Sequence, residues 1–170
     1  MQMENSTLLL IAIIVLLVAG LIFLFLQRNN IKTEHNEASA DPATKTLRLH
    51  AYERLTLLVD RIALPNLISR VNQGGLSARE MQVLLTRNLR EEYEYNISQQ
   101  IYVSSDSWNA VKNLKEQNML VVNQLASALP PHATGLDLNK LLLEYLMTDQ
   151  KGQLHEVVSD VLSYEAKKLL

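Results

Sequence analysis

The sequence predicts an all-α protein with one N-terminal transmembrane helix and a cytoplasmic bundle of four to five helices. Three observations predict this fold class: one long apolar run near the N-terminus, apolar residues at helical spacing through the rest of the chain, and no segment with the period of two that is typical of strands. Hydrophobic residues make up 48% of the 170 residues, which excludes disorder along the whole chain. The absence of cysteine excludes a disulfide scaffold, a thiolate zinc site and a cysteine nucleophile.

The apolar run predicts a membrane anchor. Residues 8–26 carry no charge and are apolar except for Gly20. A helix of this length, at about 1.5 Å per residue, crosses the hydrocarbon core of a bilayer. We therefore expect residues 1–6 to form a short tail and residues 7–27 to lie in the lipid bilayer. A cleaved signal peptide fits less well, because residues 1–6 carry no positive charge and the run is longer than the apolar segment of most signal peptides.

The distribution of positive charge predicts the orientation of this anchor. Every lysine and arginine follows the apolar run, and Arg28 and Lys32 lie close to its end. Because positive residues favour the cytoplasmic side, we expect the C-terminal domain to be cytoplasmic. The same domain in the periplasm is the alternative.

The remainder divides into a tether and a helical domain. Residues 28–45 hold few apolar groups and are expected to form a flexible tether, and residues 46–170 a helical bundle. The first helix, over residues 46–63, should bury one face, and Pro65 should open a short helical turn that Gly74 and Gly75 close. The residues expected on the buried face are Leu47, Ala51, Leu55, Leu58 and Ile62.

Three further stretches complete the predicted bundle. Ser77 and Glu80 have the spacing of a capping box and should begin a long helix. Residues 104–106 should end it and cap the next helix, which the proline pair at 130–131 breaks. Two shorter amphipathic helices should follow, around residues 138–146 and 154–162. A row spaced by four is expected to lie buried along the long helix: Met81, Leu85, Leu89, Tyr93, Ile97 and Ile101.

Several short stretches, in this order along the chain, carry a resemblance to a known family: 51–55 (AYERL), 61–62 with 65–67 (RI and PNL), 98–104 (SQQIYVS), Trp108 and 111–112. They resemble an uncharacterised family of short single-pass inner-membrane proteins from bacteria of the Bacteroidetes group. The resemblance implies a location in the bacterial inner membrane. It brings no catalytic residue, substrate or cofactor.

No motif for catalysis, metal or cofactor binding is found. His50 and Glu53 share a helix face, but a di-iron bundle needs two Glu-x-x-His units and two further inward carboxylates, whereas this chain has one unit in the reversed order. Glu91 and Glu94 could supply an acid–base pair, yet no histidine lies near them in the sequence, and a solvated helix face explains them as well. Phosphate-binding loops and serine-hydrolase elbows are absent from the sequence. We therefore expect no enzyme activity, no cofactor and no metal.

The arginines are unevenly distributed. Residues 45–90 hold eight positive groups and three acids, whereas residues 91–170 hold six lysines and eleven acids. Three interpretations remain open. The basic and acidic halves could pair within the bundle, the basic face could contact anionic lipid, or the basic face could contact an acidic partner. Nucleic acid is not expected, because no binding motif accompanies the charge. The candidate contact residues are Arg48, Arg54, Arg61 and Arg70.

The aromatic residues of the middle of the chain have two interpretations. Trp108, Tyr93, Tyr95 and Tyr102 could line a partner pocket, or most of them could pack in the core.

Together, the anchor, tether and bundle predict a non-enzymatic, membrane-anchored interaction or scaffold module. Such a module could be an accessory subunit of a membrane complex with a protein partner, and self-association is compatible with it. An enzyme or small-ligand-binding bundle that uses Glu91, Glu94 or His50 is the alternative.

Overall fold

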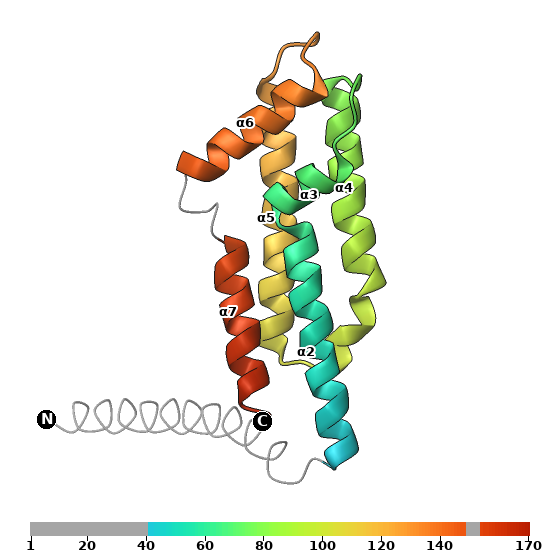
Figure 1. Ribbon diagram of the computed structural model, residues 1–170, viewed down its shortest axis with the longest axis vertical. Coiled ribbons are helices and arrows are strands. Elements are labelled where there is room, and N and C mark those ends of the chain that lie inside the picture. The colour runs from blue at the N-terminus through green and yellow to red at the C-terminus, as the bar shows by residue number, and fades with distance from the viewer. Residues whose placement is uncertain (1–40, 149–153) are drawn as a thin grey trace, which may run out of the picture. The chain divides into compact units, whose positions relative to one another are not determined.

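A computed structural model describes residues 41–148 and 154–170 (Figure 1). These residues form six α-helices, one 3-10 helix and no strand, which confirms the predicted all-α bundle. The predicted number of four to five helices is too low, because the segment that contains Pro65 is a separate helix of eight residues rather than a single turn. The predicted tail, the membrane span and residues 28–40 of the tether lie outside the described residues. Within the described ranges, no helix combines the length and apolar character needed to cross a membrane. The elements are α2 (Pro42–Ile62), α3 (Leu64–Val71), α4 (Ala78–Tyr95), η1 (Ile97–Ile101), α5 (Ser105–Ala128), α6 (Gly135–Thr148) and α7 (Leu154–Lys167).

The first described helix begins earlier than predicted. α2 starts at Pro42, so the last residues assigned to the tether are helical. Proline at the first turn favours this start because its φ angle is already helical. Leu47 is 51% exposed, and its predicted burial is wrong. The buried face of α2 begins only at Ala51, one turn later, and the other four predicted positions are buried.

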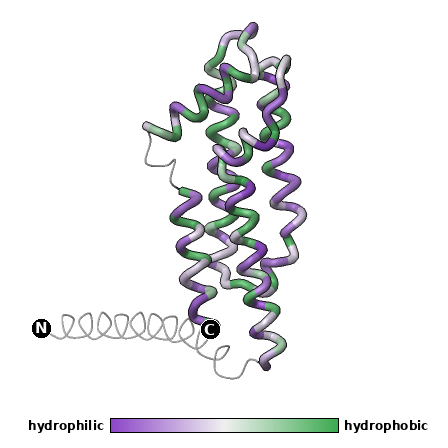
Figure 2. The backbone as a smooth tube through the Cα atoms, in the orientation of Figure 1, coloured by the Kyte–Doolittle hydropathy of each residue, from purple (hydrophilic) through white to green (hydrophobic). Residues whose placement is uncertain are grey.

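The core of residues 45–170 lies between all six α-helices, α2 to α7. It is built from aliphatic side chains that recur along each helix, and Figure 2 shows hydrophobic and hydrophilic residues alternating along the same helices. Because each helix buries only one stripe, the polar positions remain available on the outside. The fully buried large side chains include Leu55, Leu85, Leu114, Leu138 and Leu162.

The long row on α4 is confirmed in its first half only. Met81, Leu85 and Leu89 are all 0% exposed. The helix ends at Tyr95, and the 3-10 helix η1 that follows has about three residues per turn, so a spacing of four no longer keeps one face. The predicted burial of Ile97 and Ile101 is therefore wrong, since they are 47% and 73% exposed.

The starts of α4 and α6 are joined to each other. The predicted capping box at Ser77 and Glu80 is present. A second box, which the sequence analysis missed, links Thr134 to Asp137, whose carboxylate accepts from the Thr134 N–H at 2.8 Å. The two segments pair through Ala78 N–H to the Ala133 carbonyl at 2.9 Å and Gly135 N–H to the Leu76 carbonyl at 2.7 Å. This pairing fixes the two helix starts side by side.

We expect Gly135→Ala to lower the free energy of unfolding by about 1 kcal/mol, because overpacking a close contact is destabilising. An added Cβ would lie 3.1 Å from the Met81 Cβ and 3.2 Å from the Leu76 carbonyl oxygen. Urea unfolding of the full chain in detergent, followed by circular dichroism, measures the change. Gly74→Ala is the matched control, because its Cβ would have no neighbour within 4 Å. An equal loss in both variants would contradict the close approach.

Two side-chain hydrogen bonds hold α2 against the start and middle of α5. The Ser104 N–H donates to the buried Tyr52 hydroxyl at 3.2 Å, and the buried Asn118 amide donates to the Ile62 carbonyl at 2.8 Å. The second bond satisfies a carbonyl at the C-terminal end of α2, where the helix itself offers no partner. Ser104 also caps α5 as predicted. These bonds set the position of α2, one wall of the groove described next.

Candidate functional site

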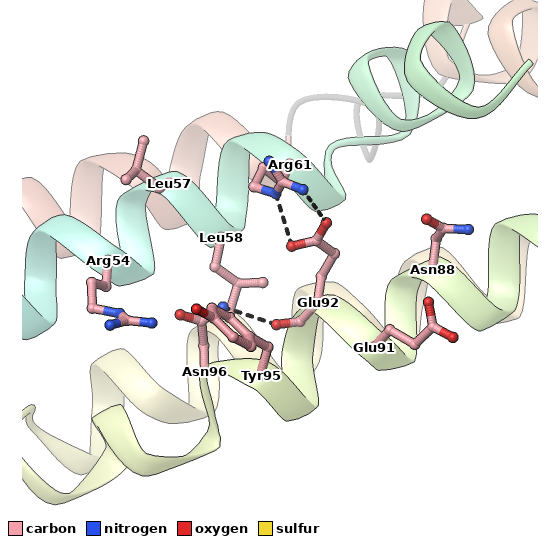
Figure 3. Close-up of a pocket in the computed structure, with 9 residues that line it drawn as sticks. All are labelled: Arg54, Leu57, Leu58, Arg61, Asn88, Glu91, Glu92, Tyr95 and Asn96. Carbon is pink, nitrogen blue, oxygen red and sulfur yellow. Dashed lines mark hydrogen bonds and ion pairs between the residues drawn. The ribbon is translucent and has the colours of Figure 1, made fainter.

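An open groove of about 690 Å³ runs between α2 and α4. Each helix contributes side chains at spacings of three, four and seven residues, so the groove extends along about two helical turns. Figure 3 shows Arg61 and Glu92 meeting across the gap between the two helices, whereas Leu57 points away from α4 at the rim. The lining residues are Arg54, Leu57, Leu58 and Arg61 from α2, and Asn88, Glu91, Glu92, Tyr95 and Asn96 from α4 and its end.

Glu92 is the most strongly held charge in this groove. Its carboxylate accepts two hydrogen bonds from Arg61, from Nε at 2.8 Å and from Nη2 at 2.6 Å, and forms an ion pair with Arg70 at 3.2 Å. Its side chain is only 15% exposed. The Arg61 hydrogen bond, together with the charges of Arg61 and Arg70, lowers the pKa of Glu92 despite its partial burial. Glu92 is therefore ionised at neutral pH and joins α2, α3 and α4.

Arg54 at the other end of the groove has a different environment. Its guanidinium lies over the Tyr95 ring, 5.5 Å from the centroid, which is a cation–π distance. Within the described residues no carboxylate forms an ion pair with it. Leu57 and Tyr95 beside it are 64% and 76% exposed. This end of the groove therefore presents a positive charge next to exposed apolar surface.

The structure brings together three of the four predicted contact arginines. Arg54 and Arg61 line the groove, and Arg70 from α3 reaches it through Glu92. Arg48 is half-buried on α2 and does not line the groove. Its helical position lies about 120° from that of Arg54, on the opposite flank. What these arginines contact outside the chain stays a prediction.

Pairing between the basic and acidic halves of the bundle is limited. Within the described ranges, two ion pairs join different helices, and Glu92 is the acid in both of them, with Arg61 and with Arg70. The other ion pairs lie within one helix or its end, at separations of one to four residues: His50–Glu53, Arg87–Glu91, Lys115–Glu116, Lys140–Glu144 and Glu165–Lys168. The groove lining itself holds two arginines (54 and 61) and two glutamates (91 and 92). Arg70 and Arg87, which do not line the groove, also pair with these glutamates. Arg54 is therefore the charge of the lining that forms no ion pair within the described residues.

The residues proposed for the alternative enzyme site do not come together. His50 contacts its helix neighbour Glu53 at 3.0 Å, with both side chains largely exposed. Glu94 is exposed and does not line the groove, whereas Glu91 does. In the part of the chain that the structure describes, no three His, Asp or Glu side chains lie close enough to hold a metal ion. Of the three candidate residues, Glu91 alone lines the groove, and neither His50 nor Glu94 joins it there as a catalytic acid or base.

The aromatic side chains divide between the two interpretations. Tyr93 and Trp108 are half-buried against the core, with ring centroids 5.1 Å apart. Burial raises the pKa of Tyr93, and the nearby charge of Glu116 adds to this. Tyr95 and Tyr102 are exposed, and Tyr95 lines the groove. A joint aromatic pocket of all four residues is therefore not formed.

Leu57 and Asn88 line the groove although neither was predicted as a contact residue, whereas Tyr95 was among the aromatic residues considered for a partner pocket. A signal was present, because Arg54, Leu57 and Arg61 repeat at three and four residues on a face beside the buried one. The same spacing relates Asn88, Glu91 and Tyr95 on α4. The sequence alone did not indicate that these two faces meet.

The fold and the groove together define a class of protein: an all-helical bundle with an open, partly apolar and partly charged groove on one side. The chain belongs to a family of unknown function, DUF7935, whose family model matches residues 2–169. This agrees with the resemblance to an uncharacterised family. Neither a curated protein nor a solved structure matches the chain.

Proposed function

We propose that this chain is a non-enzymatic, membrane-anchored helical interaction module that binds another polypeptide in the groove between α2 and α4. The anchor is residues 7–27, in the inner membrane of a bacterium of the Bacteroidetes group, with the bundle on the cytoplasmic side. The module serves as a scaffold or accessory subunit of a membrane complex. The groove is the single observation that carries the proposal.

The groove has the features that support polypeptide binding. Exposed apolar side chains on a protein surface mark interaction sites when they form a patch with polar residues around it. Leu57 on α2 and Tyr95 on α4 each supply exposed apolar surface to the groove, and Arg54 provides a charge that no carboxylate of the described residues pairs with. Arginine and tyrosine are also the residue types that most often dominate binding energy at interfaces. The two-turn length of the groove suits one face of a bound helix.

The proposal is tested by a photoreactive amino acid placed at Leu57 in the full chain expressed in bacterial cells. We expect an ultraviolet-dependent crosslink to a polypeptide, recovered with the washed membrane fraction. Leu136 is the matched control position, because it is a leucine with 70% exposure on α6 and does not line the groove. No specific crosslink at position 57 would contradict the interaction module, and recovery of the chain in the soluble fraction would contradict the anchor.

Binding of a small polar molecule is the second candidate, and the size of the groove favours it. Ligand pockets commonly enclose roughly 300–1,000 Å³, and Asn88, Glu91 and Asn96 give this groove hydrogen-bonding groups. The photoreactive side chain distinguishes the two candidates, because a groove that holds only a small molecule gives no crosslink to a polypeptide.

A further inference from the structure

The exposed face of α7 has the chemistry that the groove lacks. Val157 and Tyr164 are 56% and 65% exposed, and because they lie seven residues apart they share one side of the helix. Glu156 and Asp160 are exposed along one edge of this stripe. Neither carboxylate forms an ion pair within the described residues. This stripe, defined by Val157, Asp160 and Tyr164 with Glu156, is called the α7 stripe.

The α7 stripe matches the groove in spacing and in charge. The groove presents Arg54, Leu57 and Arg61 over seven residues, and the stripe presents Val157, Asp160 and Tyr164 over the same length. Apolar residues can therefore meet Leu57 and Tyr95, while the acidic edge reaches Arg54. Arg54 of the groove and the acids Glu156 and Asp160 of α7 form no ion pair within the described residues, and their charges are complementary. Lys168, whose Nζ lies 4.4 Å from the Tyr164 ring centroid, makes the C-terminal end of the stripe positive, so the complementarity favours a register with the acids next to Arg54.

The two surfaces lie on different sides of one bundle and cannot meet within one chain. α7 packs on α5 through its buried side chains Val158 and Leu162. Figure 1 shows α7 and α4 separated by α5 and α2. The α7 stripe of one copy can therefore occupy only the groove of another copy. Such a contact joins two different surfaces, so it generates rings or chains rather than a symmetric pair.

We infer that the partner in the groove is the α7 stripe of a second copy of this chain. The inference rests on the proposed function and specifies its partner. Anchoring in one membrane raises the local concentration of copies, so a two-turn contact of modest affinity suffices for association.

The absence of cysteine from the sequence permits a direct test. Two differently tagged full-length copies are coexpressed, one with Leu57→Cys and one with Tyr164→Cys, and the membranes are treated with a short bismaleimide crosslinker. We expect a crosslinked product that carries both tags. The control pair combines Leu57→Cys with Leu136→Cys. Leu136 is about as exposed as Tyr164, so its cysteine should react with the crosslinker equally well, but it lies on α6 away from the stripe.

Charge reversal tests the register of the contact. Adding Arg54→Glu to the first copy, or Asp160→Arg to the second, should reduce the mixed product about tenfold, whereas both changes together should restore it. Arg54 and Asp160 are exposed, so each variant should retain the helical circular dichroism of the parent.

Three results would overturn the inference: equal yields in the stripe and control pairs, a loss that the double reversal does not restore, or preferential crosslinking between two Leu57→Cys copies. A photo-crosslink from position 57 to a different protein would overturn it too, while leaving the proposed interaction module intact. The absence of every crosslink at position 57 would contradict both.

Discussion

Leu85→Ala is expected to lower the free energy of unfolding by about 3 kcal/mol, in the middle of the range for leucine-to-alanine changes in cores. Leu85 is 0% exposed in the second turn of the buried face of α4. The change removes buried apolar surface and leaves a cavity that the neighbouring helices fill only in part. Urea unfolding of the full chain in detergent measures the loss.

Val83→Ala is the matched control for this prediction. Val83 lies on the same helix, is 51% exposed and should change the free energy of unfolding by less than about 0.5 kcal/mol. A similarly small change for Leu85→Ala would mean that α4 does not pack on the core through this face.

Glu92→Gln is expected to lower the free energy of unfolding by about 1.5 kcal/mol at pH 7, because it leaves Arg61 and Arg70 close together without their counter-charge. The effect should depend on pH. The pKa of Glu92 is lowered in the folded protein, so its contribution is fully present above its ordinary value of about 4.5 and is lost as the pH falls through the lower folded value. The difference between the parent and the variant should therefore shrink on acidification.

Unfolding measured at pH 7, 5 and 3.5 checks this dependence. Glu94→Gln is the matched control, since Glu94 is exposed on the same helix and forms no ion pair within the described residues. Glu80 and Asp137 also have a lowered pKa, each held by the capping contacts of its helix start. Their acid-dependent loss is common to all variants and cancels in the difference. A gap between parent and Glu92→Gln that stays constant with pH would contradict the assigned role.

Local sequence signals predicted the helices well where one short-range interaction decides the outcome. The capping box at Ser77 and the cap at Ser104 were both readable, because donor and acceptor lie three residues apart. The predicted burial of the row beyond Tyr93 was wrong for a local reason that residue spacing does not reveal. Asn96 bonds back to the Glu92 carbonyl at 2.9 Å and the chain tightens into η1, which turns Ile97 and Ile101 outward.

The groove could not be predicted, because contacts far apart in the sequence position its walls. The side-chain bonds of Tyr52 to Ser104 and of Asn118 to Ile62 span 52 and 56 residues. A periodic pattern shows which side of a helix is polar, but it does not show how far that side stands from another helix. The clustering of Arg54, Arg61 and Arg70 near one carboxylate follows from this packing.

The same two bonds between α2 and α5 have a mechanical consequence. A force applied along α2 from its N-terminal end should act first on its two hydrogen bonds to the α5 segment, those of Tyr52 with Ser104 and of Ile62 with Asn118. It should act on the paired starts of α4 and α6 only afterwards. Both bonds involve buried side chains, so water does not readily replace them. α2 and α5 should therefore move as one stiff element under tension, while the width of the groove depends on the Arg61–Glu92 contact between α2 and α4.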